Sequence, residues 1–397
     1  MLRLIDLFFT GIFASIILLW VLGVRGFKIG RIASAMKRHL AVTSVLFWTA
    51  LIIFAALFIV YFDYFADIHD IDEAVQAAVK HYLIGVNPYE EYVVPRFQGK
   101  YAPNVMWTLG PYNYLPIDLF VYVGLHEAIG WLGFPTWFVI ANLILSGAAF
   151  VVLRKILKTD WIAYAPVAGI VMLFFSFDNA SLTLLLMVLS MFAYKRAKWH
   201  PGGLAILIMA LATLTKVFAG IPLVVLVLYE FQAGIKARSW KRVGETVTAS
   251  AMGAGIALLL FLPFGITNVL DAAVFFHGSE DLRVGTSVGG TILSEILSGS
   301  EYYTMISAAV VFAALVVGMR LKSLNDRALL AIVAFLLVAV KSSLAPLTVA
   351  GLFLILRLKE LSDERIVTRN ARDSDTTNHD LDAAQVESNS LTHMGVR

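Results

Sequence analysis

Long apolar runs, repeated along most of the chain, are the feature that most restricts how this protein can fold. Crossing the hydrocarbon of a bilayer, about 30 Å thick, takes roughly 20 consecutive apolar residues in a helix. Runs of about this length lie at residues 4–24, 39–61, 135–153, 160–177, 178–194, 245–266 and 301–319. A water-soluble core cannot enclose so many, so they predict an all-α integral membrane protein that crosses the bilayer many times.

The composition agrees with this interpretation and excludes several kinds of chemistry. Charged residues make up 15% of the 397 residues, against about 25% in soluble domains, and these are too few to cover a globule of this size. Cysteine is absent, which excludes disulfides, thiolate metal sites and cysteine nucleophiles. No small-residue cleavage site follows the run at 4–24, so we expect it to be retained as the first span.

Two further apolar stretches, 202–231 and 328–357, are too long for a single span and carry a lysine near the middle. The lysines are Lys216 and Lys341, and a proline follows each one within a few residues. We expect each stretch to form two short helices that meet near one membrane face. There the lysine either extends to the membrane surface or points into a cavity.

The positions of the basic residues predict the orientation of the spans. Lysine and arginine concentrate in short loops at residues 25–38, 154–158, 195–198, 236–242 and 320–327. Cytoplasmic loops carry such an excess, so all five loops are predicted to be cytoplasmic. Two long loops, 62–115 and 267–300, then lie on the outer face, and each contains an amphipathic helical pattern.

The number of crossings depends on segment 115–133, which contains Asp118, His126 and Glu127. If this segment crosses the membrane, the basic loop at 154–158 falls on the outer face, so a re-entrant or interfacial position fits better. We expect about 11 crossings, with 12 as the alternative. They occupy residues 1–358, and the polar residues 359–397 form a disordered cytoplasmic tail.

The first outer loop begins with the clearest amphipathic pattern in the chain. Between Asp70 and Gly85, apolar residues recur at helical spacing, at Ile71, Ala74, Val75, Ala78, Val79, Tyr82 and Leu83. A helix with such a stripe beside a membrane lies in the interface. Gly85 is expected to end the helix, and Asn87-Pro88-Tyr89 to form a turn.

Three acidic residues stand at the start of this helix. Asp70 followed by Glu73 matches an N-terminal capping pattern, and negative charge is favourable in the first turn of any helix. Capping explains Asp72 less well, because three acids in four residues exceed what a cap requires. A carboxylate at the mouth of a helix bundle can serve as a general base, so Asp72, with Asp70 as the competing choice, is the predicted catalytic residue.

The rest of the loop combines aromatic residues with two cations. Tyr89, Tyr112 and Tyr114 either belong to an interfacial aromatic belt or contact an acceptor. Arg96 and Lys100 run against the positive-inside trend, and a negatively charged ligand such as a phosphate would account for them.

The order of these motifs resembles that of a known family. Asp70-Ile-Asp72-Glu73, Gly85-Val-Asn87-Pro88-Tyr89 and Tyr112-Asn-Tyr114-Leu-Pro116 follow one another in the first outer loop. This resembles the GT-C superfamily of membrane glycosyltransferases, especially the mannosyltransferases that use polyprenol-phosphate mannose. The resemblance covers residues from about 40 to 358, although an additional span, 4–24, precedes the first outer loop here.

The resemblance implies a fold, a reaction and partners. The fold is a bundle of transmembrane helices, and the reaction moves a sugar, mannose in most relatives, from a polyprenyl- or dolichyl-phosphate donor to a lipid or glycan acceptor. An acidic residue of the first outer loop is the base, and the anomeric carbon is inverted. The site lies on the extracytoplasmic side of the cell membrane, and beyond membrane lipids no other partner, such as nucleic acid, is implied.

Cations are expected to stabilise the departing phosphate. The candidates are Arg96, Lys100, Lys216, His277, Arg283 and Lys341. Asp70 and Asp72 could share a divalent cation through oxygen ligands, but the resemblance favours a reaction without a metal or other cofactor.

Two other activities would also suit a chain with many spans. A transporter or lipid flippase should show inverted repeats and helices broken at the membrane midplane, and we find no repeat in the sequence. A polymerase or ligase of lipid-linked glycans would share the same chemistry and differ in its donor. The depth of Lys216 and Lys341 discriminates, because a position near one face favours transfer and a midplane position favours transport.

Overall fold

The computed structural model describes a little more than half of the chain. The described residues are 14–18, 20–21, 71–90, 94–98, 106–112, 114–158, 180–197, 200–274, 303–338, 349–361 and 363–364. For 71–73, 94–98, 106–110 and 303–304 the backbone alone is described. The expected spans at 39–61 and 160–177 lie outside these ranges, as do residues 275–300 of the second outer loop and the tail from 365 onward.

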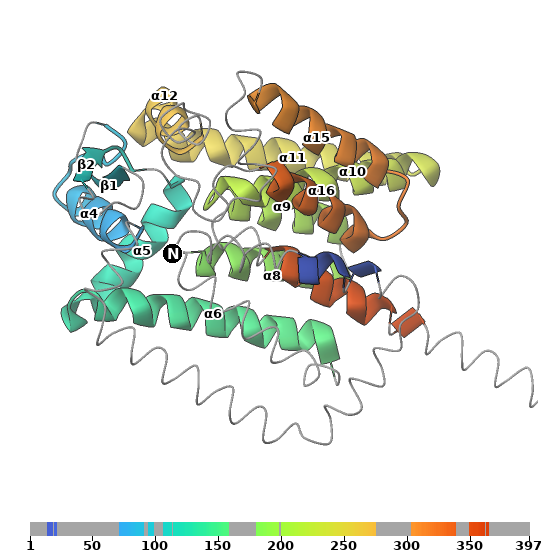
Figure 1. Cartoon of the computed structure of the whole chain (residues 1–397), viewed down its shortest axis with the longest axis horizontal. Helices are drawn as coiled ribbons and strands as arrows, with labels where there is room; N and C mark the ends of the chain where they lie inside the picture. Colours follow the sequence, from blue (N-terminus) through green and yellow to red (C-terminus); the bar gives the residue numbers. More distant parts are fainter. Residues whose placement is uncertain are drawn as a thin grey trace, which may run out of the picture.

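Helices make up most of the described chain (Figure 1). They are α4 (Ile71–Leu83), α5 (Pro116–Ile129), α6 (Thr136–Leu157), α8 (Ser181–Arg196), α9 (Pro201–Thr213), α10 (Gly220–Lys236), α11 (Trp240–Phe261), α12 (Ile266–Val269), α15 (Tyr303–Gly318) and α16 (Leu324–Val338). Residues 14–18 and 349–361 are also helical. The spans predicted at 135–153, 178–194, 245–266 and 301–319 therefore all coincide with helices.

Three helical segments within the described ranges are long and apolar enough to cross a membrane. They are Thr136–Leu157, Val217–Lys236 and Trp240–Phe264. Two shorter apolar helices, Pro201–Thr213 and Met305–Gly318, accompany them. The structure thus supports a helical protein with several candidate membrane spans.

The helices form one bundle in which each helix packs against one or more neighbours. α8 lies between α6 and α9, α11 packs on the other side of α9, and α10 contacts α9, α11 and α16 (Figure 1). α15 packs along α16. Buried apolar side chains of α8 and α9, among them Leu184, Met187, Ile206 and Met209, fill the space between these helices.

The apolar stretch around Lys216 is interrupted at the lysine, as the sequence predicts. α9 ends at Thr213, a 3-10 turn covers Val217–Ala219, and α10 begins at Gly220. Lys216 itself has extended backbone angles, φ −141° and ψ 131°. The expectation of two short helices is right for α9 but wrong for the second half, which with its 3-10 turn is long enough to cross the membrane. The corresponding break at Lys341 lies outside the described residues.

The first outer loop contains the predicted helix, α4, and a feature that was not expected. α4 buries Ala74, Val75, Ala78 and Val79, and Gly85 follows it with φ +82°, a conformation that favours glycine. Beyond it, β1 (Val94–Gln98) and β2 (Met106–Gly110) pair antiparallel, with Phe97 opposite Trp107. The all-α expectation therefore needs this small hairpin added to it.

The segment whose crossing was in doubt forms α5. Its 14 residues extend over about 21 Å, which is less than the hydrocarbon thickness of about 30 Å. α5 packs against α4 and α6, and Figure 1 shows α4, both strands and α5 together at one end of the bundle. With the 3-10 turn Gly130–Leu132 that follows it, the segment lies against α4 of the first outer loop and against α6.

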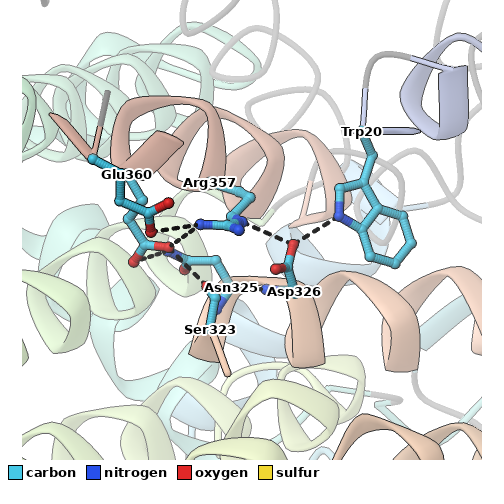
Figure 2. Close-up of polar contacts among 7 residues, drawn as sticks. Trp20, Ser323, Asn325, Asp326, Arg357 and Glu360 are labelled. Atoms are coloured by element: carbon cyan, nitrogen blue, oxygen red, sulfur yellow. Dashed lines mark hydrogen bonds and ion pairs between the residues drawn. The ribbon is translucent and has the colours of Figure 1, made fainter. Parts of the chain in front are cut away.

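A buried polar network occupies the opposite end of the bundle, at the turn between α15 and α16 (Figure 2). Asp326 Oδ1 accepts hydrogen bonds from Trp20 Nε1 at 2.8 Å and from Arg357 Nε at 2.9 Å. The carboxylate of Glu360 accepts from Ser323 Oγ and Asn325 Nδ2, both at 2.7 Å. These bonds join Trp20 to α16 and to helix 349–361, which continues three residues past the expected start of the tail.

A second ion pair, built on the buried Glu230, joins three helices and lies against a fourth. Glu230 on α10 accepts two hydrogen bonds from Arg242 on α11, at 2.7 and 2.6 Å, and one from the Tyr194 hydroxyl on α8 at 2.8 Å. A Cβ atom at Gly202 on α9 would overlap the Glu230 carboxylate. Glycine at this position thus lets α9 approach the ion pair closely.

Candidate functional site

The clearest candidate site lies where the first outer loop meets the break between α9 and α10. The Lys216 ammonium lies over the ring of Tyr114, 4.1 Å from the ring centroid. Lys216 is 7% exposed and Tyr114 is half-buried. A cation held on an aromatic face in a desolvated position interacts favourably with the ring. Two residues singled out separately in the sequence are therefore in direct contact.

Backbone and hydroxyl hydrogen bonds hold this junction together. The Leu115 N–H donates to the Thr215 carbonyl at 3.4 Å, joining the loop to the residue before Lys216. The Thr215 and Thr183 hydroxyls are hydrogen-bonded at 2.7 Å, which ties the break to α8. Thr183 and Thr215 are fully buried. The backbone on both sides of the Lys216–Tyr114 contact is thus anchored to the bundle.

The two other predicted tyrosines lie beneath Tyr114. Tyr89 and Tyr112 are buried, and each ring packs edge-on to its neighbour, with centroids 5.7 Å apart for Tyr89–Tyr112 and 5.3 Å for Tyr112–Tyr114. The Tyr89 hydroxyl donates to the Tyr114 carbonyl at 2.7 Å, and the Tyr112 hydroxyl donates to Asp118 Oδ2 at 2.8 Å. Within this group, Tyr114 is the ring with accessible surface, and the other two support it.

Burial and charge keep both supporting tyrosines protonated. Burial raises the pKa of Tyr112 and of Tyr89 well above the ordinary value, and the nearby Asp118 carboxylate raises the pKa of each further. Their hydroxyls therefore remain neutral hydrogen-bond donors at physiological pH. Neither is suited to act as a base in this arrangement.

The Asn87-Pro88-Tyr89 turn binds the first outer loop to the 3-10 turn Leu262–Phe264 that follows α11. Asn87 Oδ1 accepts from the Tyr89 N–H at 3.0 Å, and Asn87 Nδ2 donates to the Phe264 carbonyl at 3.0 Å. The Tyr89 and Phe264 rings are 5.0 Å apart. The Tyr112 N–H donates to the Pro88 carbonyl at 2.7 Å, which closes the loop on itself. The Asn87-Pro88-Tyr89 part of the motif therefore holds the first outer loop in place against the helix bundle.

Asp118 is the residue at this junction to which the sequence assigned no role in the site. It stands in the first turn of α5, is fully buried and accepts the Tyr112 hydrogen bond. An acidic residue inside the otherwise apolar segment 115–123 is the signal that could have identified it, because burying a charge is costly unless something compensates for it.

Several predicted site residues cannot be compared with this geometry. Asp70, Lys100, His277, Arg283 and Lys341 lie outside the described residues, and for Asp72 and Arg96 the backbone alone is described. The Asp72 backbone lies in the first turn of α4, a helix that packs against α5 and β1. Arg96 is on β1, opposite Thr108.

Within the described ranges, no three or more histidine or acidic side chains lie close enough together to hold a metal ion. What the junction does provide is a buried cation on a tyrosine face, supported by a hydrogen-bonded aromatic group and an adjacent carboxylate. Such a cation can bind an anionic oxygen. Comparison of the chain with models of known families, with curated proteins and with solved structures found no match.

Proposed function

We propose that this protein transfers a sugar from a polyprenyl- or dolichyl-phosphate donor to a lipid or glycan acceptor on the extracytoplasmic face of a membrane. Mannose is the sugar favoured by the resemblance to GT-C mannosyltransferases. The full chain would cross the bilayer about 11 or 12 times, with both long loops on the outer face. The catalytic centre would lie between the first outer loop and the helix break at Lys216.

The observation that supports this proposal most is the contact between Lys216 and Tyr114. A donor with a phosphate leaving group needs a cation beside a platform for the sugar, at the end of the bundle where the outer loop packs. Lys216 and Tyr114 have these properties together. A transporter would be expected to keep such a lysine at the midplane of a broken helix, away from a long loop.

The chemical step can be written with these groups. The acceptor hydroxyl oxygen attacks the anomeric carbon as the bond from that carbon to the phosphate oxygen breaks, and the configuration inverts. The hydroxyl proton passes to the carboxylate of Asp72, or of Asp70, acting as general base. The phosphate leaves on its lipid carrying additional negative charge, which the Lys216 ammonium stabilises.

Membranes containing the full chain test this proposal with radiolabelled polyprenyl-phosphate mannose and, in parallel, polyprenyl-phosphate glucose. Wild-type protein is expected to transfer label from one of them, and Lys216→Gln to lose about 100-fold or more of the rate, as when an oxyanion donor is removed. Lys241→Gln is the matched control, because Lys241 lies in the first turn of α11, at the end predicted to be cytoplasmic, and its side chain is 79% exposed.

The same membranes give a test of the rival activities. Movement of a labelled lipid-linked sugar across the bilayer, with no transfer to any acceptor, would replace sugar transfer by transport. Full transfer activity in Lys216→Gln would remove the lysine from the reaction and leave the proposal without its main support.

A further inference from the structure

A chain of contacts leads from Asp118 to the Lys216 ammonium. Asp118 Oδ2 accepts the Tyr112 hydroxyl at 2.8 Å, and the ring of Tyr112 packs edge-on to that of Tyr114. Lys216 rests on the Tyr114 ring. Each member is buried or half-buried, so a shift at one end cannot be absorbed by solvent and must displace the next side chain.

The usual reasons for an acidic residue in a first helical turn do not account for Asp118. In a capping box such a residue would accept from the N–H of the N-cap residue, here Leu115. The Leu115 N–H instead donates to Thr215, and the N-cap has no side-chain hydrogen bond. The helix dipole favours the charge, but that gain is several times smaller than the cost of burying a carboxylate.

Opposite charge nearby offers a reason for keeping the carboxylate. Asp118 and Lys216 are a buried acidic residue and a buried basic residue that contact the same tyrosine group, Asp118 through the Tyr112 hydroxyl and Lys216 on the Tyr114 ring. Across a desolvated group of this kind each charge favours the other, because the local dielectric is low. An anionic donor would add its charge beside Lys216.

We propose that Asp118 is a positioning residue of the transfer site, which holds Tyr112 and, through it, sets the Tyr114 ring on which the Lys216 ammonium rests. This inference rests on the proposed function for its consequence in catalysis. Its structural content, that Asp118 and Tyr112 control the environment of Lys216, does not depend on any activity. The two parts can therefore be tested separately.

The first test measures the reactivity of Lys216 in the purified full chain. A brief pulse of an amine-acetylating reagent is followed by peptide mass spectrometry, with the exposed Lys241 as internal reference. Lys216 is expected to react slowly in wild type, because it is buried. In Tyr112→Phe and in Asp118→Asn the rate should rise about tenfold, since each variant weakens a hydrogen bond to a charged group.

The matched control is Tyr122→Phe on the same helix. Tyr122 is also fully buried, and its hydroxyl donates to Asn142 Oδ1 at 2.7 Å, which joins α5 to α6 and not to the loop. This variant loses an equivalent buried hydroxyl but should leave acetylation of Lys216 unchanged. If all three variants alter Lys216 equally, or none does, Asp118 has no positioning role.

The second test measures sugar transfer by the same variants. Tyr112→Phe and Asp118→Asn are expected to lower kcat about tenfold with a smaller change in the KM for donor, whereas Tyr122→Phe stays near wild type. A change in acetylation without any transfer by wild type would sink the proposed function and leave the link from Asp118 to Lys216 intact. Wild-type kcat in both variants would overturn the catalytic part of the inference. If Asp118→Asn fails to fold, Tyr112→Phe decides the outcome alone.

Discussion

The Lys216 ammonium lies 4.1 Å from the centroid of the Tyr114 ring, although the two residues are 102 positions apart in the chain. Tyr114 belongs to the loop predicted to lie on the outer face, and Lys216 to a break between two apolar helices. The contact brings together the two features of this sequence that suggest recognition of an anionic lipid-linked substrate. Substitutions at the two residues of this contact are therefore expected to differ in their effects on transfer activity.

Substitutions at Tyr114 separate its ring from its hydroxyl. Tyr114→Phe keeps the aromatic face and should retain transfer activity close to that of wild type. Tyr114→Leu removes the cation–π contact, which is worth about 0.5–2 kcal/mol, and should weaken transfer by about twofold to thirtyfold. Initial rates at several donor concentrations measure the effect. Equal activity of the two variants would show that the ring contributes nothing to Lys216.

Substitutions at Asp72 and Asp70 decide which carboxylate is the base. We expect Asp72→Asn to lower the transfer rate by about 100- to 10,000-fold, as for loss of a general base, with unchanged expression. Asp70→Asn should retain activity and nearly full stability, because asparagine caps a helix about as well as aspartate. Glu90→Gln, an exposed acid of the same loop, is the control. The reverse result assigns the role to Asp70, and activity in both variants excludes a first-loop base at these positions.

Removal of Arg357 should destabilise the bundle without reaching the candidate site. Arg357→Met leaves the buried Asp326 carboxylate without its arginine, and breaking a buried pair from one side costs about 3–5 kcal/mol. The double variant Arg357→Met with Asp326→Leu should recover part of this loss. Thermal unfolding in detergent measures it, with Arg320→Met on the adjacent turn as an exposed control. Because the network lies at the opposite end of the bundle (Figure 1), activity per folded molecule should persist.

Adjacent glycines on α9 provide a test of helix packing. Gly202→Ala places a Cβ against the Glu230 carboxylate, which cannot move freely because Arg242 and Tyr194 hold it, so we expect a loss of about 1–3 kcal/mol. At Gly203 a Cβ would come no closer than 3.7 Å to the Glu245 carbonyl. Gly203→Ala should therefore be neutral or gain up to about 1 kcal/mol from helix propensity. The difference in unfolding temperature between the two variants is the measurement.

Much of the local structure follows from residue order alone. Apolar runs of sufficient length predict helices because buried backbone in an apolar medium must satisfy its own hydrogen bonds, and the helices at 135–153 and 245–266 appear where expected. The 3.6-residue spacing from Ile71 to Leu83 predicts α4, and a lysine inside an apolar run predicts the break at Lys216. Each of these depends on neighbours a few residues apart.

The β1–β2 hairpin and the surroundings of Asp118 depended instead on contacts between residues that are not sequence neighbours. The pairing of Val94–Gln98 with Met106–Gly110 depends on contacts between the two strands. In the sequence alone, an interfacial aromatic belt explains the aromatic residues of this loop equally well. In the sequence, Asp118 is one acid in an apolar segment. Its hydrogen bond to Tyr112, the placement of Tyr114 under Lys216 and the anchoring of Leu115 by Thr215 arise only when the loop packs on the bundle, because burial and charge compensation are properties of the assembled neighbourhood. The sequence by itself determined a helical chain with membrane-spanning runs and a lysine at a helix break, and the tertiary structure decided which side chains share the space around that lysine.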